Sequence, residues 1–129
     1  MAVRIAVVAV ALAAAAWLGV AARSFSAQDR IAKLALAERT PTRADLVTAR
    51  ALLPQAKRLN PDARLEQSLG VLEFRAGEEA AAVATFRALT RREPRNAELW
   101  SLLARVARDY DPALSARAAR RAATLSPPR

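Results

Sequence analysis

Residues 62–95 read DARLEQSLGVLEFRAGEEAAAVATFRALTRREPR, and this stretch decides how the chain folds. Leu65, Leu69 and Leu72 recur at the spacing that gathers apolar side chains on one face of an α-helix. Gly77 interrupts the pattern, and a glycine here can take the left-handed backbone conformation that ends many helices. The stretch therefore predicts two helices joined by a short turn.

Both helices of this unit carry local signals of the expected kind. We expect the first over residues 63–76 and the second over residues 78–92. Ala82, Phe86 and Leu89 form an apolar face on the second helix. Two glutamates open that helix and two arginines close it, which is the charge order that a helix dipole favours. The two apolar faces are expected to pack together as a hairpin.

The same unit recurs along the chain. Pro61, Pro94 and the proline pair at 127–128 lie 33 or 34 residues apart, and an apolar helix, a breaker and a second apolar helix lie between them. Repeats of this length are typical of stacked hairpins, because one hairpin cannot bury its apolar face alone. The sequence therefore predicts two full units, residues 62–95 and 96–129.

In the second unit we expect helices over residues 97–109 and 112–125. Asn96 and Asp111 are placed to cap their N-termini, as Asp62 is in the first unit. The expected inner faces of these two helices carry Leu99, Leu103, Val106, Tyr110, Ala116, Ala119 and Ala123.

A degenerate unit precedes the two repeats. Thr42 and Asp45 have the spacing of a capping box at the start of a helix over residues 43–59. Its expected inner face carries Ala49, Leu53 and Ala56. No helix breaker separates the preceding residues from the N-terminus, so one continuous helix is predicted over residues 3–39.

Residues 5–22 form an apolar run of 18 residues without a charge, with Arg4 and Arg23 on either side. As a helix this run spans about 27 Å, close to the thickness of a bilayer core. We expect residues 1–22 to be a transmembrane anchor that is an uncleaved signal anchor; a cleaved signal peptide and a buried soluble helix are the alternatives. Orientation is weakly encoded, and the short N-terminal tail favours export of the C-terminal side.

The repeated unit resembles the tetratricopeptide repeat, a helical hairpin of 34 residues with small and aromatic residues at set positions. The matching residues are Leu69, Gly70, Gly77, Ala82, Phe86 and Pro94 in the first unit, and Trp100, Leu103, Ala104, Ala116, Ala123 and Pro128 in the second. The chain departs from the signature at Glu66, Glu73 and Arg120, where Trp, Tyr and Phe are usual.

The resemblance implies an all-α fold in which a transmembrane helix is followed by about two and a half hairpins. Residues 23–42 would be a juxtamembrane helix and linker, and residues 43–61 a degenerate, capping repeat. Tetratricopeptide arrays bind partners along the groove lined by their first helices. The partner-binding residues implied here are Arg64, Gln67, Val71, Phe74, Arg75, Ser101, Arg105 and Arg108. Phe74 has a second interpretation, as a side chain packed on the upstream helix.

Composition limits the chemistry of this chain of 129 residues. It has no cysteine and no histidine, so the commonest nucleophile, general base and metal ligands are missing. About a quarter of the residues are alanine, and a net charge of +9 is carried almost wholly by arginine, a usage typical of high-GC bacterial genomes. We expect no catalysis, no metal and no cofactor.

The sequence therefore predicts a non-enzymatic, membrane-anchored scaffold that binds an envelope protein through its groove. The expected location is the bacterial inner membrane, with residues 5–22 crossing it and the repeats outside the cytoplasm. An accessory subunit of an envelope enzyme complex, such as one that polymerises or ligates polysaccharide, and a basic module for lipid or glycan are the alternative functions. Nucleic acid is not an expected partner, because no aromatic residues alternate with the arginines. No small-molecule substrate is expected either.

Overall fold

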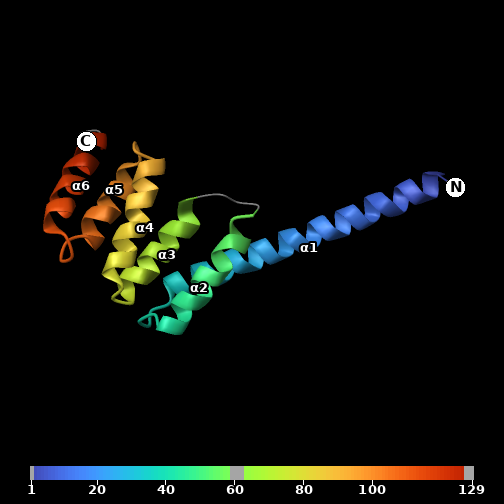
Figure 1. Cartoon of the computed structure of the whole chain (residues 1–129), viewed down its shortest axis with the longest axis horizontal. Helices are drawn as coiled ribbons and strands as arrows, with labels where there is room; N and C mark the ends of the chain where they lie inside the picture. The colour runs from blue at the N-terminus through green and yellow to red at the C-terminus, as the bar shows by residue number, and fades with distance from the viewer. Residues whose placement is uncertain (1, 59–62, 127–129) are drawn as a thin grey trace.

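Helix-favouring alanine, leucine, arginine and glutamate dominate the chain, and the regular structure is helical wherever it is described. The computed structural model describes residues 2–58 and 63–126, with side chains from Val10 onward. Its elements are α1 (Ala2–Leu36), α2 (Arg43–Ala56), α3 (Ala63–Arg75), α4 (Glu79–Arg92), α5 (Ala97–Val106) and α6 (Pro112–Leu125) (Figure 1). The expected cap Asp62 and the prolines at 61 and 127–128 lie outside the described residues.

Chain neighbours pair to form three helical hairpins. The most extensive contacts join α1 to α2, α3 to α4 and α5 to α6, and smaller contacts of α4 with α5 and of α3 with α1 and α2 hold the hairpins together. The C-terminal half of α1 is thus the partner of α2 in the first hairpin.

The N-terminal half of α1 projects away from the bundle as a single uninterrupted helix (Figure 1). Ala21 is the first buried side chain among those described, and Ser24, Ala27 and Ile31 continue a buried stripe along the same face. Residues 10–19, which precede this stripe, are all exposed, and Trp17 among them is 62% exposed. The helix is long and apolar enough to span a membrane.

The turn between α1 and α2 is held by a capping box, as predicted. Thr42 Oγ1 accepts a hydrogen bond from the Asp45 amide at 3.3 Å, and Asp45 Oδ2 accepts one from the Thr42 amide at 2.7 Å. Arg39 donates to both carboxylate oxygens of Asp45, at 2.7 and 2.9 Å. These hydrogen bonds together lower the pKa of Asp45 well below its ordinary value, with the contribution of Arg39 the largest.

Close helix contact explains the small residues of the central hairpin. Gly77 has a φ of 79°, the left-handed conformation expected at the turn between α3 and α4. Gly70 lies against the ring of Phe86, and a Cβ atom at position 70 would lie only 2.7 Å from Phe86 Cε2. Phe86 is fully buried, so its ring has no free space into which it could move. Any larger residue at 70 would push α3 and α4 apart.

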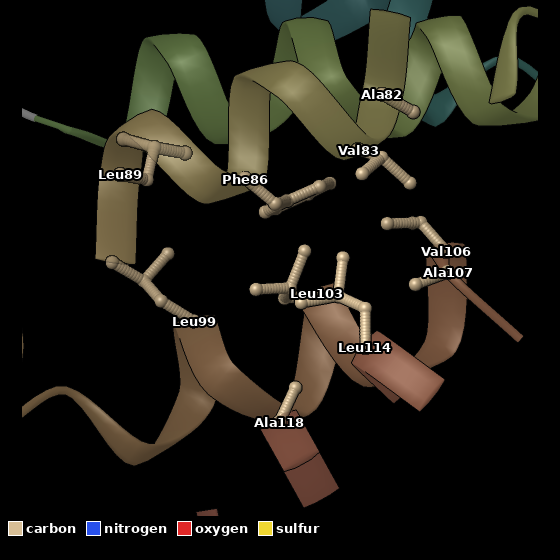
Figure 2. Close-up of a cluster of buried hydrophobic side chains, with 10 residues drawn as sticks. All are labelled: Ala82, Val83, Phe86, Leu89, Leu99, Leu103, Val106, Ala107, Leu114 and Ala118. Atoms are coloured by element: carbon tan, nitrogen blue, oxygen red, sulfur yellow. The ribbon is translucent and has the colours of Figure 1, made fainter. Parts of the chain in front are cut away.

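The main core lies between α4, α5 and α6. In Figure 2 the side chains of α4 point toward those of α5, with the α6 residues completing the far side. This cluster consists of Ala82, Val83, Phe86, Leu89, Leu99, Leu103, Val106, Ala107, Leu114 and Ala118. Two smaller clusters join α1 and α2 to α3, so the apolar interior runs through all three hairpins.

Two expectations for the last hairpin were wrong. Tyr110 is 54% exposed, because α5 ends at Val106 and Tyr110 lies in the turn that follows. On α6 the expected inner residues Ala116, Ala119 and Ala123 are exposed, and the buried stripe is instead Leu114, Ala118 and Ala122. The predicted stripe followed a strict 34-residue period and lies one or two residues too far along the chain. The actual stripe brings Leu114, the only large apolar side chain early in α6, into the core.

Both helices of that hairpin start as predicted. Asn96 Oδ1 accepts from the amides of Glu98 and Leu99, at 3.1 and 3.4 Å. Asp111 Oδ1 accepts from the Leu114 amide at 2.9 Å, and a proline occupies the first helical position after it. Such caps satisfy amides that have no partner inside the helix.

Candidate partner-binding groove

A hollow of about 440 Å³ lies between the end of α1, the outer face of α3 and the start of α5. It is lined by Ala35, Leu36, Arg64, Gln67, Ser68, Val71 and Glu98. Three of these residues, Arg64, Gln67 and Val71, belong to the set implied by the repeat resemblance. We call this hollow, together with the exposed face of α5 that continues it, the groove.

The hollow is lined by both apolar and polar side chains. Leu36 is 82% exposed at the last position of α1, and Val71, which is half-buried, lines the same hollow. Gln67 Nε2 donates to Glu98 Oε1 at 3.2 Å and so joins α3 to α5.

Ser101, Arg105 and Arg108 follow Glu98 by three, seven and ten residues, the spacing of one helix face, and all three are exposed. The Ser101 hydroxyl donates to the carbonyl of Ala97 at 3.0 Å, within its own helix. Within residues 2–58 and 63–126, the guanidinium groups of Arg105 and Arg108 form no ion pair. This side of the groove therefore presents two cationic groups to solvent.

Arg75 stabilises the end of α1, a role that the sequence did not indicate. Its guanidinium donates to the carbonyls of Ala35, Ala37 and Arg39, at 2.8, 2.5 and 2.9 Å. Carbonyls at the end of a helix lack partners within it, and a cation there is also favoured by the helix dipole. Arg75 thus caps α1 and fixes the segment that leads to α2, which shapes one end of the groove.

Phe74 is half-buried and packs on the cluster formed by α4, α5 and α6. The second interpretation, packing on the upstream helix, is therefore wrong, because the ring lies on the downstream side of α3. Substituting Phe74 would disturb the core as well as any bound partner.

Ion pairs between α2, α3 and α4 were missed by the sequence interpretation, which treated Glu66 and Glu73 only as departures from the repeat signature. Glu73 is buried and accepts from Arg50 Nη2 at 2.8 Å and from Thr85 Oγ1 at 2.7 Å. Arg50 also donates to Glu78 at 2.6 Å. The hydrogen bond from Arg50 to Glu73 is the largest cause that raises the pKa of Arg50 above its ordinary value, and the hydrogen bond to Glu78 is the second.

Glu66 lies seven residues before Glu73 on α3, and it pairs with Lys57 and Arg92. Lys57, directly after α2, likewise follows Arg50 by seven residues. The two cations therefore meet the two carboxylates of α3 in antiparallel order. This matched spacing was the signal available in the sequence. Among the described residues no group of three or more His, Cys, Asp or Glu side chains is placed to hold a metal ion.

Comparison of the chain with protein families, with curated proteins and with solved structures gives no match. The likeness to the tetratricopeptide repeat therefore depends on residues of this chain alone. What is established is an all-α arrangement of three hairpins with one long apolar N-terminal helix.

Proposed function

We propose that this chain is a non-enzymatic, membrane-anchored scaffold that binds an envelope protein through its groove. The observation that carries the proposal is the division of α1 into an exposed apolar half and a half packed in the bundle. Val10, Leu12 and Leu18 are each more than 60% exposed on the first half. Such a surface is costly in water, and a lipid bilayer would cover it.

Continuity of α1 would hold the groove at a constant height above the membrane. The apolar run ends at residue 22, and Ala35 and Leu36 at the other end of the same helix form one wall of the groove. At about 1.5 Å per residue, the groove would stand roughly 20 Å from the membrane surface. A scaffold that presents a partner to a membrane enzyme needs such a constant geometry.

The chemistry of the groove favours an acidic protein segment that carries an apolar side chain. Leu36 and Val71 offer the apolar contact, and Arg105 and Arg108 offer cationic groups that make no ion pair in the described structure. Complementary charge raises association rate and specificity. The repeat resemblance supports the same face, since first helices line the groove in such arrays. We place the protein in the bacterial inner membrane, with the bundle outside the cytoplasm.

Membrane extraction tests the anchor. We expect the full chain to remain in the membrane pellet after high-salt and alkaline carbonate washes and to be released by detergent. The physical reason is that salt screens charges but leaves the apolar contact of residues 5–22 with lipid intact. Release of the chain by high salt alone would contradict the anchor.

The groove is tested by co-purification of partners from native membranes. We expect Leu36→Asp combined with Arg105→Glu to remove the partners that the wild-type chain retains, because an apolar contact is lost and one cationic group is reversed in charge. The matched control is Val47→Asp with Arg117→Glu, which makes the same kinds of change at two exposed positions on α2 and α6. Equal partner recovery from both variants would contradict the groove, provided that circular dichroism shows equal helicity.

A further inference from the structure

A second cavity, of about 500 Å³, lies where α1 enters the bundle beside the end of α2. It is lined by Val20, Arg23, Ser24, Gln55 and Arg58. Figure 1 shows the end of α2 lying next to the point where the projecting half of α1 begins. The groove is formed by other residues, so this cavity is a separate feature of the molecule.

The local hydrogen bonding leaves both arginines of this cavity available. The carbonyl of Ala56, at the end of α2, accepts from Ser24 Oγ at 3.0 Å and from Gln28 Nε2 at 3.1 Å. The helix end is thereby satisfied without a cation. Over the described ranges, 2–58 and 63–126, neither Arg23 nor Arg58 forms an ion pair. Several other cations of the first two hairpins, such as Arg39, Arg50 and Lys57, pair with carboxylates.

The position of the cavity along α1 points to lipid. Arg23 is the first charged residue after the apolar run, and Val20 lies one helical turn earlier on the cavity wall. Trp17 is exposed a further turn toward the N-terminus, and tryptophan favours the interface between hydrocarbon and headgroups. A helix that crosses the bilayer through this run would hold Arg23 and Arg58 at headgroup depth.

We propose that this cavity binds the phosphate of an anionic phospholipid headgroup. Arg23 and Arg58 would hold the phosphate, because guanidinium groups match phosphate oxygens in charge and in planar geometry. Ser24 and Gln55 line the wall beside it, and the acyl chains would run along the exposed face of α1 past Val20 and Trp17. This inference rests on the anchor of the proposed function, and it adds recognition of a particular lipid class.

Lipid retention by the full chain tests the proposal. The protein is purified in an uncharged detergent, supplied with equimolar phosphatidylglycerol and phosphatidylcholine, and examined by native mass spectrometry for bound lipid. We expect wild type to retain phosphatidylglycerol preferentially. Arg23→Gln with Arg58→Gln is expected to reduce that preference about tenfold or more, since each basic residue near a membrane surface contributes to binding anionic lipid.

The control is Arg117→Gln with Arg121→Gln, which removes the same charge from exposed positions on α6 and should retain the wild-type preference. Wild-type preference in the Arg23 and Arg58 variant, or equal loss in the control, would overturn the proposal.

Excess inorganic phosphate should leave the bound lipid in place, because the acyl chains contribute to binding. Displacement of the lipid by phosphate would overturn the assignment to a headgroup. A chain that resists carbonate extraction yet shows no lipid preference would refute this inference alone, whereas extraction by salt would refute the anchor.

Discussion

At the scale of single residues, the carboxylates of α3 show how this chain accommodates acidic side chains between its helices. Glu66 and Glu73 are each joined to cations or hydroxyls of neighbouring segments. Buried carboxylates are costly unless they are hydrogen-bonded. The buried position of Glu73 is therefore tolerated because Arg50 and Thr85 lie within hydrogen-bond distance of it.

Substituting Glu73 tests this compensation. We expect Glu73→Gln to lower the free energy of unfolding by about 1–3 kcal/mol, since the buried acceptor of the Arg50 bond loses its charge and Arg50 then keeps only one charged partner, Glu78. Thermal unfolding of the full chain in detergent, followed by circular dichroism, measures the change. Glu98→Gln, at an exposed position on α5, should change stability much less. Unfolding temperatures that are equal for the two variants would contradict the compensation.

At the scale of elements, several side-chain hydrogen bonds hold the turn between α1 and α2. Asp45 receives bonds from Arg39 and from the Thr42 amide, while Arg75 holds three carbonyls at the end of α1. The turn is thus fixed by one acid and two cations. Its geometry also determines where Leu36 lies in the groove.

Acid should weaken this turn. The pKa of Asp45 is held below its ordinary value of 3.8, so the folded form binds the proton more weakly than the unfolded chain does. The stabilisation is therefore complete above that ordinary value and is lost as pH falls below it toward the lower folded pKa. We expect hydrogen exchange at the start of α2, corrected for intrinsic rates, to increase at pH 3 relative to pH 6. In Asp45→Asn the corrected exchange should vary less over this interval, and an unchanged pH response would contradict the assignment.

At the scale of the whole molecule, α1 joins the exposed apolar segment to the bundle without a flexible linker. One helix of 35 residues is exposed over residues 10–19 and packed against α2 and α3 at its end. A continuous helix transmits orientation, so the proposed groove and the proposed anchor would move as one body. The proposed lipid site and the proposed protein groove lie at different heights along this helix.

Spin-label distances can measure that rigidity, and the absence of cysteine makes site-specific labelling straightforward. Labels at Leu12→Cys and Val47→Cys, both exposed, should give one narrow distance distribution for the otherwise wild-type chain. Adding Ala22→Pro should broaden or shift it, because proline removes a helical hydrogen bond and costs about 3 kcal/mol. A broad distribution without the proline would show that the helix is not continuous in solution.

Much of the fold could be predicted from local signals. The capping residues Thr42, Asn96 and Asp111 and the turn at Gly77 depend on bonds within a few residues, and the structure agrees with each. The buried stripe of α6 could not be predicted in this way. Its register depends on the contact of Leu114 with side chains of α5, and the length of the turn before α6 differs from that in the preceding hairpin.

The residues of the candidate groove also fall into two groups, those that local helical spacing predicts and those that only the packing of the hairpins brings together. Arg64, Gln67 and Val71 share a face of one helix, so helical spacing alone predicts that they lie together, and they line one hollow. Leu36 and Glu98 were missed, because they come from α1 and α5 and reach the hollow only through the packing of the hairpins. Arg75 was assigned to the groove face, although its partners are carbonyls near the end of a helix more than thirty residues earlier.

The sequence by itself determined the all-helical character of this protein, most helix boundaries and the long apolar helix at its N-terminus. These properties follow from composition, caps and apolar spacing, which act over one or two helical turns. The tertiary structure alone decided which carboxylates are buried, where Arg75 is bonded, which face of α6 enters the core and that Arg23 and Arg58 line one cavity. Each of these depends on contacts between segments distant in the chain, and such contacts arise only when whole hairpins pack against one another.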